Sequence, residues 1–214
     1  MNHLIVINQE QPDEDGVRTA VETLQQGGII IYPTETVYGL GVDCENEQAV
    51  KNLYRVKKRK ETKPFSLIAA DREMVRDYVD EVSGFGRKLM DRFWPGPLTI
   101  VFKASTNVNP LITGGTAAIG IRVPDNMFCC TLVQQLGRPI TSTSANLSGE
   151  KECRKIEQIP GALKSATDVI LDGGETRGIV PSTVISIANY PPEILREGAV
   201  SRNLIEDFLG ITLS

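Results

Sequence analysis

Two patterns of hydrophobic residues alternate along the chain. Short apolar runs, typical of buried strands, are followed by longer segments in which apolar residues recur every three or four positions, which is typical of amphipathic helices. The predicted strands cover residues 4–8, 29–33, 65–70, 97–104, 113–124, 138–143, 168–173, 182–188 and 192–198. The predicted helices cover residues 13–28, 46–57, 71–79, 84–94, 126–137, 156–164 and 201–210. Asn46 is a candidate N-cap, and Gly137 a candidate helix end.

This alternation predicts an α/β fold in which helices flank a twisted sheet. The last two predicted strands are too close together in sequence for a helical crossover, so the sheet is expected to be mixed rather than all parallel. With 214 residues and 41% hydrophobic residues, the chain is long enough for a substantial core. We therefore expect a single domain over residues 1–214.

Composition excludes several kinds of site. The only histidine is His3, which removes Ser-His-Asp and Cys-His catalysis and any His-rich metal site. The four cysteines include no Cys-x-x-Cys pair, and Cys129 and Cys130 are adjacent, so reduced thiols that serve packing are expected. The sequence lacks an apolar run of membrane-spanning length and a secretory signal, so no membrane partner and a cytoplasmic location are expected.

Charge is unevenly distributed. The net charge is −4, yet residues 51–63 contain seven Lys or Arg and one acid, Glu61. This basic segment predicts a phosphate-rich partner nearby.

Polar residues and glycines follow the predicted strands in four places, at residues 33–41, 120–125, 141–149 and 178–184. In α/β sheets, ligands bind beyond strand ends, so these four loops are expected to surround one pocket. The nearby cationic and neutral donors favour an anion with polar groups. Neither a Walker A loop nor a Gly-x-Gly-x-x-Gly fingerprint is present, so any phosphate would be held by side chains and loop amides.

Seven motifs in these regions occur in a fixed order. They are YPTETVYGLG (32–41), the Lys-x-Arg of KKR (57–59), WPGPLT (94–99), IRVP (121–124), STSANLSG (142–149), PSTV (181–184) and LREGA (195–199). Together they resemble the YrdC/Sua5/YciO family of threonylcarbamoyl-AMP synthases, over roughly residues 12 to 200. The resemblance implies a large concave cationic surface, and it is to the short, single-domain members, without the extra C-terminal domain of longer ones. It also implies the conversion of L-threonine, bicarbonate and ATP to L-threonylcarbamoyl-adenylate and pyrophosphate.

The resemblance further implies roles for individual residues. The catalytic group is expected to be Lys57, Arg59, Ser144 and Asn146. The residues expected to bind threonine are Thr34, Arg122, Ser144 and Ser182. The residues expected to bind ATP are Lys57, Arg59, Lys63, Asn146 and Arg196. Mg²⁺ is expected to be bound mainly through the ATP phosphates, with no metal site made by the protein. The adenylate would then pass to a tRNA threonylcarbamoyl transferase complex.

Two positions depart from the family pattern. Lys60 stands where a proline often follows the Lys-x-Arg arginine, and Ile68 stands where longer members carry a histidine. An alternative function also stays open, since a basic concavity of this fold could bind double-stranded RNA or tRNA without synthase activity. The acidic total charge and the few aromatic residues favour the synthase.

Overall fold

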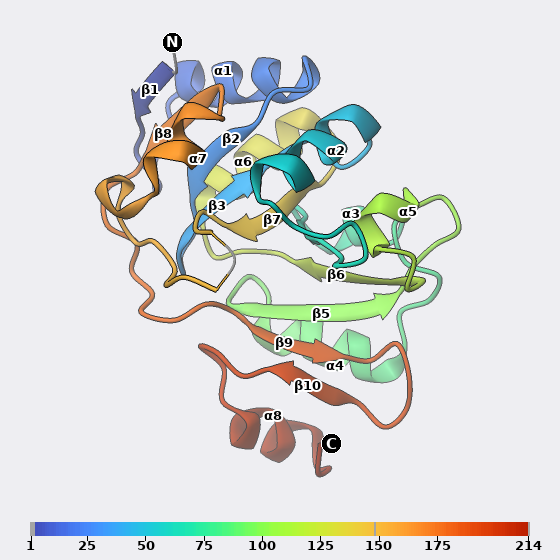
Figure 1. Ribbon diagram of the computed structural model, residues 1–214. Coiled ribbons are helices and arrows are strands. Elements are labelled where there is room, and N and C mark those ends of the chain that lie inside the picture. Colours follow the sequence, from blue (N-terminus) through green and yellow to red (C-terminus); the bar gives the residue numbers. More distant parts are fainter. Residues whose placement is uncertain (1–2, 148, 214) are drawn as a thin grey trace.

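The computed structural model describes residues 3–147 and 149–213 of the chain (Figure 1). Ser148, which belongs to the STSANLSG motif, lies outside the described residues, as do residues 1, 2 and 214. The strands are β1 (His3–Val6), β2 (Ile30–Pro33), β3 (Tyr38–Gly41), β4 (Ser66–Ile68), β5 (Leu98–Lys103), β6 (Ala118–Arg122), β7 (Ile140–Ser144), β8 (Val169–Asp172), β9 (Thr183–Ser186) and β10 (Glu193–Arg196). The helices are α1 (Glu14–Gln25), α2 (Glu47–Val56), α3 (Arg72–Val75), α4 (Gly84–Phe93), α5 (Pro110–Thr113), α6 (Met127–Leu136), α7 (Gly161–Ser165) and α8 (Arg202–Leu209), with a 3₁₀ turn η1 (Ile156–Gln158).

The described strands form one sheet of ten, in the order β1-β8-β2-β3-β7-β4-β6-β5-β9-β10. Parallel pairs such as β1–β8 and β4–β6 occur beside antiparallel pairs such as β2–β3 and β5–β6, so the predicted mixed sheet is confirmed. Strands β8 and β2 run steeply in Figure 1, whereas β6, β5 and β9 run nearly across it, so the sheet is twisted. The predicted α/β class, with helices flanking the sheet, is likewise confirmed.

Local signals explain most helix boundaries. Asn46 caps α2 by accepting a hydrogen bond from Ala49 N, as predicted, and Asp13 caps α1 in the same way. Gly137 ends α6 in the left-handed conformation, with φ of 77°, which a residue with a Cβ adopts at a cost.

Two elements were not predicted. Residues 32–41 were expected to be a strand followed by a loop, but Tyr38–Gly41 turns back and pairs with β2 as β3. The two glycines of this strand leave room for Tyr32, whose ring atoms would lie within 3.2 Å of a Cβ at Gly39. The short helix α5 was also missed, because four residues are too few to show a helical period.

The core lies on both faces of the sheet. Ile31 belongs to one buried cluster, while its neighbours Ile30 and Tyr32 belong to the other, as expected from the two-residue period of a strand. Helices α1 and α6 cover the face of Ile30 and Tyr32. Polar residues at the ends of the strands lie outside these two clusters and line the candidate site.

Candidate functional site

Residues from all four predicted loops line one pocket with a cavity volume of about 170 Å³. Its lining residues are Thr34, Thr36, Val37, Tyr38, Gly39, Arg59, Pro64, Ser66, Thr99, Arg122, Ser142, Thr143, Ser144, Pro181, Ser182, Val184 and Arg196. Eight of these described residues carry a hydroxyl group other than Tyr38, three carry a guanidinium group and none carries a carboxylate. The pocket is therefore suited to a small anion that also makes neutral hydrogen bonds.

The turn between β2 and β3 forms one wall. Thr34 Oγ1 donates to Val37 O at 2.8 Å and accepts from the backbone N–H groups of Thr36 and Val37 at 3.1 and 3.2 Å. The Thr34 hydroxyl proton and both lone pairs of its oxygen are thus used inside the turn, so this side chain fixes the shape of the wall. Thr36 also bonds within this turn, since its Oγ1 lies 2.9 Å from Thr34 Oγ1.

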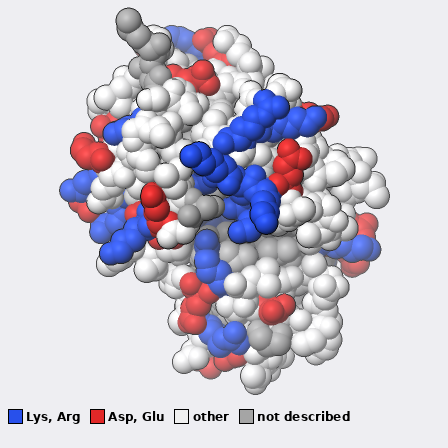
Figure 2. Space-filling view, in the orientation of Figure 1, with Lys and Arg blue, Asp and Glu red and all other residues white. Residues whose placement is uncertain are grey.

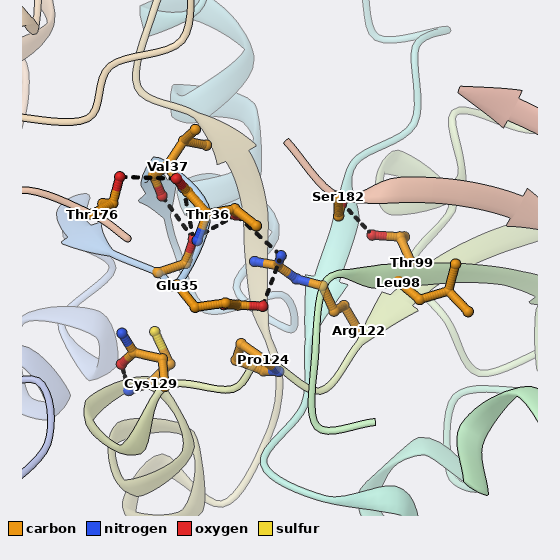
Figure 3. A network of polar contacts seen from close by, with 12 residues as sticks. Glu35, Thr36, Val37, Leu98, Thr99, Arg122, Pro124, Cys129, Thr176 and Ser182 are labelled. Atoms are coloured by element: carbon orange, nitrogen blue, oxygen red, sulfur yellow. Dashed lines mark hydrogen bonds and ion pairs between the residues drawn. The ribbon is translucent and has the colours of Figure 1, made fainter. Parts of the chain in front are cut away.

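Arg122, at the end of β6, points into the space between this turn and β9 (Figure 3). Its Nη1 lies 3.3 Å from Glu35 Oε1 and donates to Thr36 Oγ1 at 3.2 Å. The ion pair is almost buried, with side-chain exposures of 6% for Arg122 and 11% for Glu35. Glu35 Oε2 is buried without a hydrogen-bond partner among the described residues. Glu35 therefore holds the Arg122 guanidinium in place through Nη1. The part of Arg122 that lines the pocket stays available to an anion.

A pair of hydroxyl groups forms the opposite wall. Thr99 Oγ1 of β5 and Ser182 Oγ before β9 are 2.9 Å apart (Figure 3), and Arg196 Nη2 donates to Ser182 O at 2.8 Å and to Ser182 Oγ at 3.2 Å. Burial lowers the pKa of Arg196, but a guanidinium remains charged at neutral pH. Two hydroxyl protons share one mutual bond here, so one proton of the pair stays free to be donated to a ligand.

Comparison with known proteins places the chain in a family. The Sua5/YciO/YrdC family model, described as telomere recombination, matches residues 22–198. The chain belongs to the Sua5/YciO/YrdC family. A threonylcarbamoyl-AMP synthase of Vibrio vulnificus is 42% identical over 159 residues, which is 73% of this chain and 86% of that protein. A threonylcarbamoyl-AMP synthase of Pyrococcus abyssi is 36% identical over 96% of this chain, which spans 61% of that relative.

A solved structure extends this comparison to the fold. The crystal structure of Pyrococcus abyssi Sua5 complexed with L-threonine matches with a TM-score of 0.93 at 35% identity, covering 99% of this chain and 62% of that one. The chain thus spans about three fifths of the length of the Pyrococcus abyssi proteins it matches.

In this member of the Sua5/YciO/YrdC family, six of the residues singled out from the sequence come together. They are Thr34, Arg59, Arg122, Ser144, Ser182 and Arg196, all of which line the pocket. Lys57, Asn146 and Lys63 are not among the lining residues. Their roles toward ATP stay predictions.

Arg59 reaches the pocket from the basic segment. Its Nε donates to Lys63 O at 3.2 Å and its Nη2 to Pro64 O at 2.8 Å, and its guanidinium lies 5.1 Å from the centre of the Phe65 ring. These contacts hold the side chain without neutralising it. Lys63 contributes its backbone carbonyl to this arrangement, and its side chain is exposed.

Lys57 lies behind the pocket rather than in it. Only 2% of the residue is exposed, and its Nζ donates to Ser144 O at 2.6 Å and to Asn146 O at 2.5 Å. Burial, and then the nearby charge of Arg59, lower the pKa of Lys57 to about 8.

The two departures from the family pattern have different consequences. Ile68 is fully buried in the core with Phe128 and Ile140, so this position serves packing here. Lys60 is exposed, and its carbonyl accepts from Lys63 N at 2.9 Å in the turn that positions Arg59.

Figure 2 shows Lys and Arg side chains gathered across the middle of the face that Figure 1 presents.

Sequence reasoning missed Thr99 and Ser66, which line the pocket from strands, and Glu35, which binds Arg122. Thr99 belongs to the WPGPLT motif, but the alternation of its strand gave it no distinct signal.

None of the helices within the described residues is long and apolar enough to cross a membrane.

Proposed function

We propose that this protein is an L-threonylcarbamoyladenylate synthase, which forms threonylcarbamoyl-AMP and pyrophosphate from L-threonine, bicarbonate and ATP. The observation that carries the proposal is the pocket itself, which three guanidinium groups and eight Ser or Thr hydroxyl groups line together. Two relatives that carry the name threonylcarbamoyl-AMP synthase support it, and so does the relative whose structure is titled as a complex with L-threonine. They favour this function over RNA binding alone.

The size of the pocket fits the amino acid. A volume of about 170 Å³ is below the range of roughly 300–1,000 Å³ that holds drug-sized ligands. The threonine moiety and the reacting phosphate would fill this pocket, and the rest of the nucleotide would extend from it along the basic segment.

The reaction asks for alignment of anions more than for a protein nucleophile. The threonine amine attacks the carbon of bicarbonate, water leaves, and a carbamate forms. A carbamate oxygen then attacks the α-phosphorus of ATP, the bond to the β-phosphate breaks, and pyrophosphate leaves. Positioned cations stabilise the charge that gathers on the phosphates during this step.

The geometry suits a division of roles. Arg122 would pair with the threonine carboxylate, and the free hydroxyl proton of the Thr99–Ser182 pair would bind the same carboxylate from the opposite wall. Arg59 would neutralise the triphosphate and Arg196 the adenylate phosphate. Asn146 and Lys63 would join Arg59 on the ATP side.

Mg²⁺ would accompany ATP. The described residues contain no group of three or more His, Cys, Asp or Glu side chains that could hold a metal ion. The donors lining the pocket fit an ion bound mainly by phosphate oxygens, whose charge it would offset. A tRNA threonylcarbamoyl transferase complex would consume the product, because a mixed anhydride of this kind is an activated acyl donor.

The test is threonine-dependent pyrophosphate release by the purified protein with ATP, Mg²⁺ and bicarbonate. L-Threonine should stimulate release, and L-valine should not, because a site built around a hydroxyl leaves its donors unpaired with the isostere. Release that is the same with threonine, with valine and with no amino acid would refute the proposal.

A variant connects the activity to the pocket. Arg122→Met should raise KM for threonine at least tenfold, with a smaller effect on KM for ATP. Because Arg122→Met leaves Glu35 as a buried unpaired carboxylate, the double variant Arg122→Met/Glu35→Gln keeps the local charge balanced. Arg76→Met, which removes an exposed arginine paired with Glu73, is the matched control and should leave both KM values unchanged.

A further inference from the structure

Lys57 is a buried cation without an acidic partner among the described residues. It follows the last residue of α2, and its ammonium group is directed into the segment that leaves β7. Three oxygen atoms surround Nζ, namely Ser144 O at 2.6 Å, Asn146 O at 2.5 Å and Asn146 Oδ1 at 3.4 Å. All three donor positions of an ammonium group are therefore used inside the protein.

The segment held by Lys57 carries a pocket residue. Ser144 lines the pocket, and its Oγ donates to Asn146 Oδ1 at 2.5 Å. Asn146 is fixed in turn because its Nδ2 donates to Glu150 O at 2.7 Å. Since the Ser144 proton is used within this network, the hydroxyl presents its lone pairs to the pocket, as an acceptor for an N–H or O–H of the ligand.

We propose that Lys57 is a positioning residue for the threonine subsite, acting through the Ser144–Asn146 segment rather than by direct contact with ATP phosphates. The proposal rests on the synthase function proposed above. It reassigns Lys57 from the triphosphate to the amino acid side of the pocket.

The physical reason is the free energy needed to bury the ammonium group of Lys57. A buried ammonium group is expensive unless its hydrogen bonds are satisfied, and two backbone carbonyls and an amide oxygen satisfy this one. For Nζ to reach a phosphate in the pocket, it would have to leave these acceptors, and the segment that bears Ser144 would lose its anchor. Arg59, which already faces the pocket, can supply the phosphate contact without that loss.

The two roles differ in one measurement, which is threonine affinity in the absence of ATP. If Lys57 positions Ser144, Lys57→Met should weaken threonine binding by at least tenfold in isothermal titration calorimetry without nucleotide. If Lys57 only binds phosphate, that variant should bind threonine as the wild type does and lose affinity for ATP alone. The second result would overturn the proposal.

Two controls accompany this experiment. Lys60→Met removes an exposed lysine from the same basic segment and should leave threonine affinity unchanged. Lys57→Arg keeps a cationic donor and should recover part of the lost affinity. Circular dichroism and urea unfolding establish that each variant is folded at the temperature of the titration.

A measurement on the wild-type protein covers the case in which Lys57→Met does not fold. In a sample labelled with ¹⁵N-lysine, the buried Nζ should give a signal protected from exchange with water, and saturating ATP should leave it protected and little shifted. Absence of any protected lysine Nζ signal, or a large shift on adding ATP, would contradict the proposal. Failure of the wild type to bind threonine at all would refute the synthase function instead, so the two failures are distinguishable.

Discussion

Gly198 offers a direct test of how tightly the pocket is built. This glycine follows β10, and a Cβ placed on it would lie 2.3 Å from Pro181 O and 2.7 Å from both Ser182 C and Ser182 O. All three are backbone atoms of the segment that carries Ser182 into the pocket. Ordinary contact begins at 3.4 Å, so Gly198→Ala requires the peptide between Pro181 and Ser182 to move by about 1 Å.

Two consequences follow from that displacement. The free energy of unfolding should fall by about 1–3 kcal/mol, as is typical when a side chain is forced into packed structure. Arg196 should lose its hydrogen bonds to Ser182 O, at 2.8 and 3.2 Å, and the Thr99–Ser182 pair should separate. A misplacement of this size at a reacting centre costs on the order of 10²-fold in rate.

The assays are urea unfolding and threonine-dependent pyrophosphate release. Gly84→Ala is the matched control, because Gly84 begins α4, lacks a positive φ and has no atom within 4 Å of its added Cβ. That control should change stability by no more than about 0.5 kcal/mol. The reasoning is wrong if Gly198→Ala unfolds at the same urea concentration as the wild type and keeps full threonine-dependent activity.

Three further predictions concern groups outside the pocket lining. Arg138→Ala should destabilise the protein by about 1–3 kcal/mol, because it leaves the Asp43 carboxylate, 4% exposed, without its two hydrogen bonds at 2.6 and 2.8 Å; removal of the exposed Arg76 should cost less than about 1 kcal/mol in the same urea titration. Burial raises the pKa of every cysteine thiol, Cys130 to about 11, so a thiol reagent at neutral pH should label the native protein far more slowly than the urea-unfolded protein, and equal rates would contradict the packing. Because the pKa of Lys57 is lowered from 10.5 to about 8 on folding, the unfolded chain binds more protons between these values, and the Lys57 contribution to the free energy of unfolding should rise with pH across that window. The stability difference between wild type and Lys57→Met should therefore grow in favour of the wild type from about pH 8 to about pH 10.5, and a constant difference would rule out the lowered pKa.

Local sequence was informative wherever a short-range interaction decides the structure. The helix period located α1, α2, α4 and α6, and the capping role of Asn46 was predicted from its place before an apolar repeat. The hydrophobic period did not predict the strand that forms only by pairing with distant strands. Residues 38–41 contain two glycines and have little strand propensity, and they form β3 because β2 and β7 offer hydrogen bonds on both sides.

The sequence likewise predicted only part of the candidate site. Polar loops after strands indicated a common pocket, and family resemblance selected Thr34, Arg122 and Ser182, which do lie in it. The direction of each side chain could not be read from the loops. Lys57 and Arg59 are two residues apart in one motif, yet Arg59 lines the pocket and Lys57 is buried behind it.

By itself, therefore, the sequence determined the α/β class, most of the elements and the set of polar groups available to a ligand, because periodicity, caps and motifs act over a few residues. Only the tertiary structure decided which of these groups face the pocket and which support it. Glu35 is 87 residues from Arg122, and Thr99 is 83 residues from Ser182, so both contacts exist only after the strands have paired. Hydrogen-bond partners over such separations are set by the order of strands in the sheet, which no local pattern encodes.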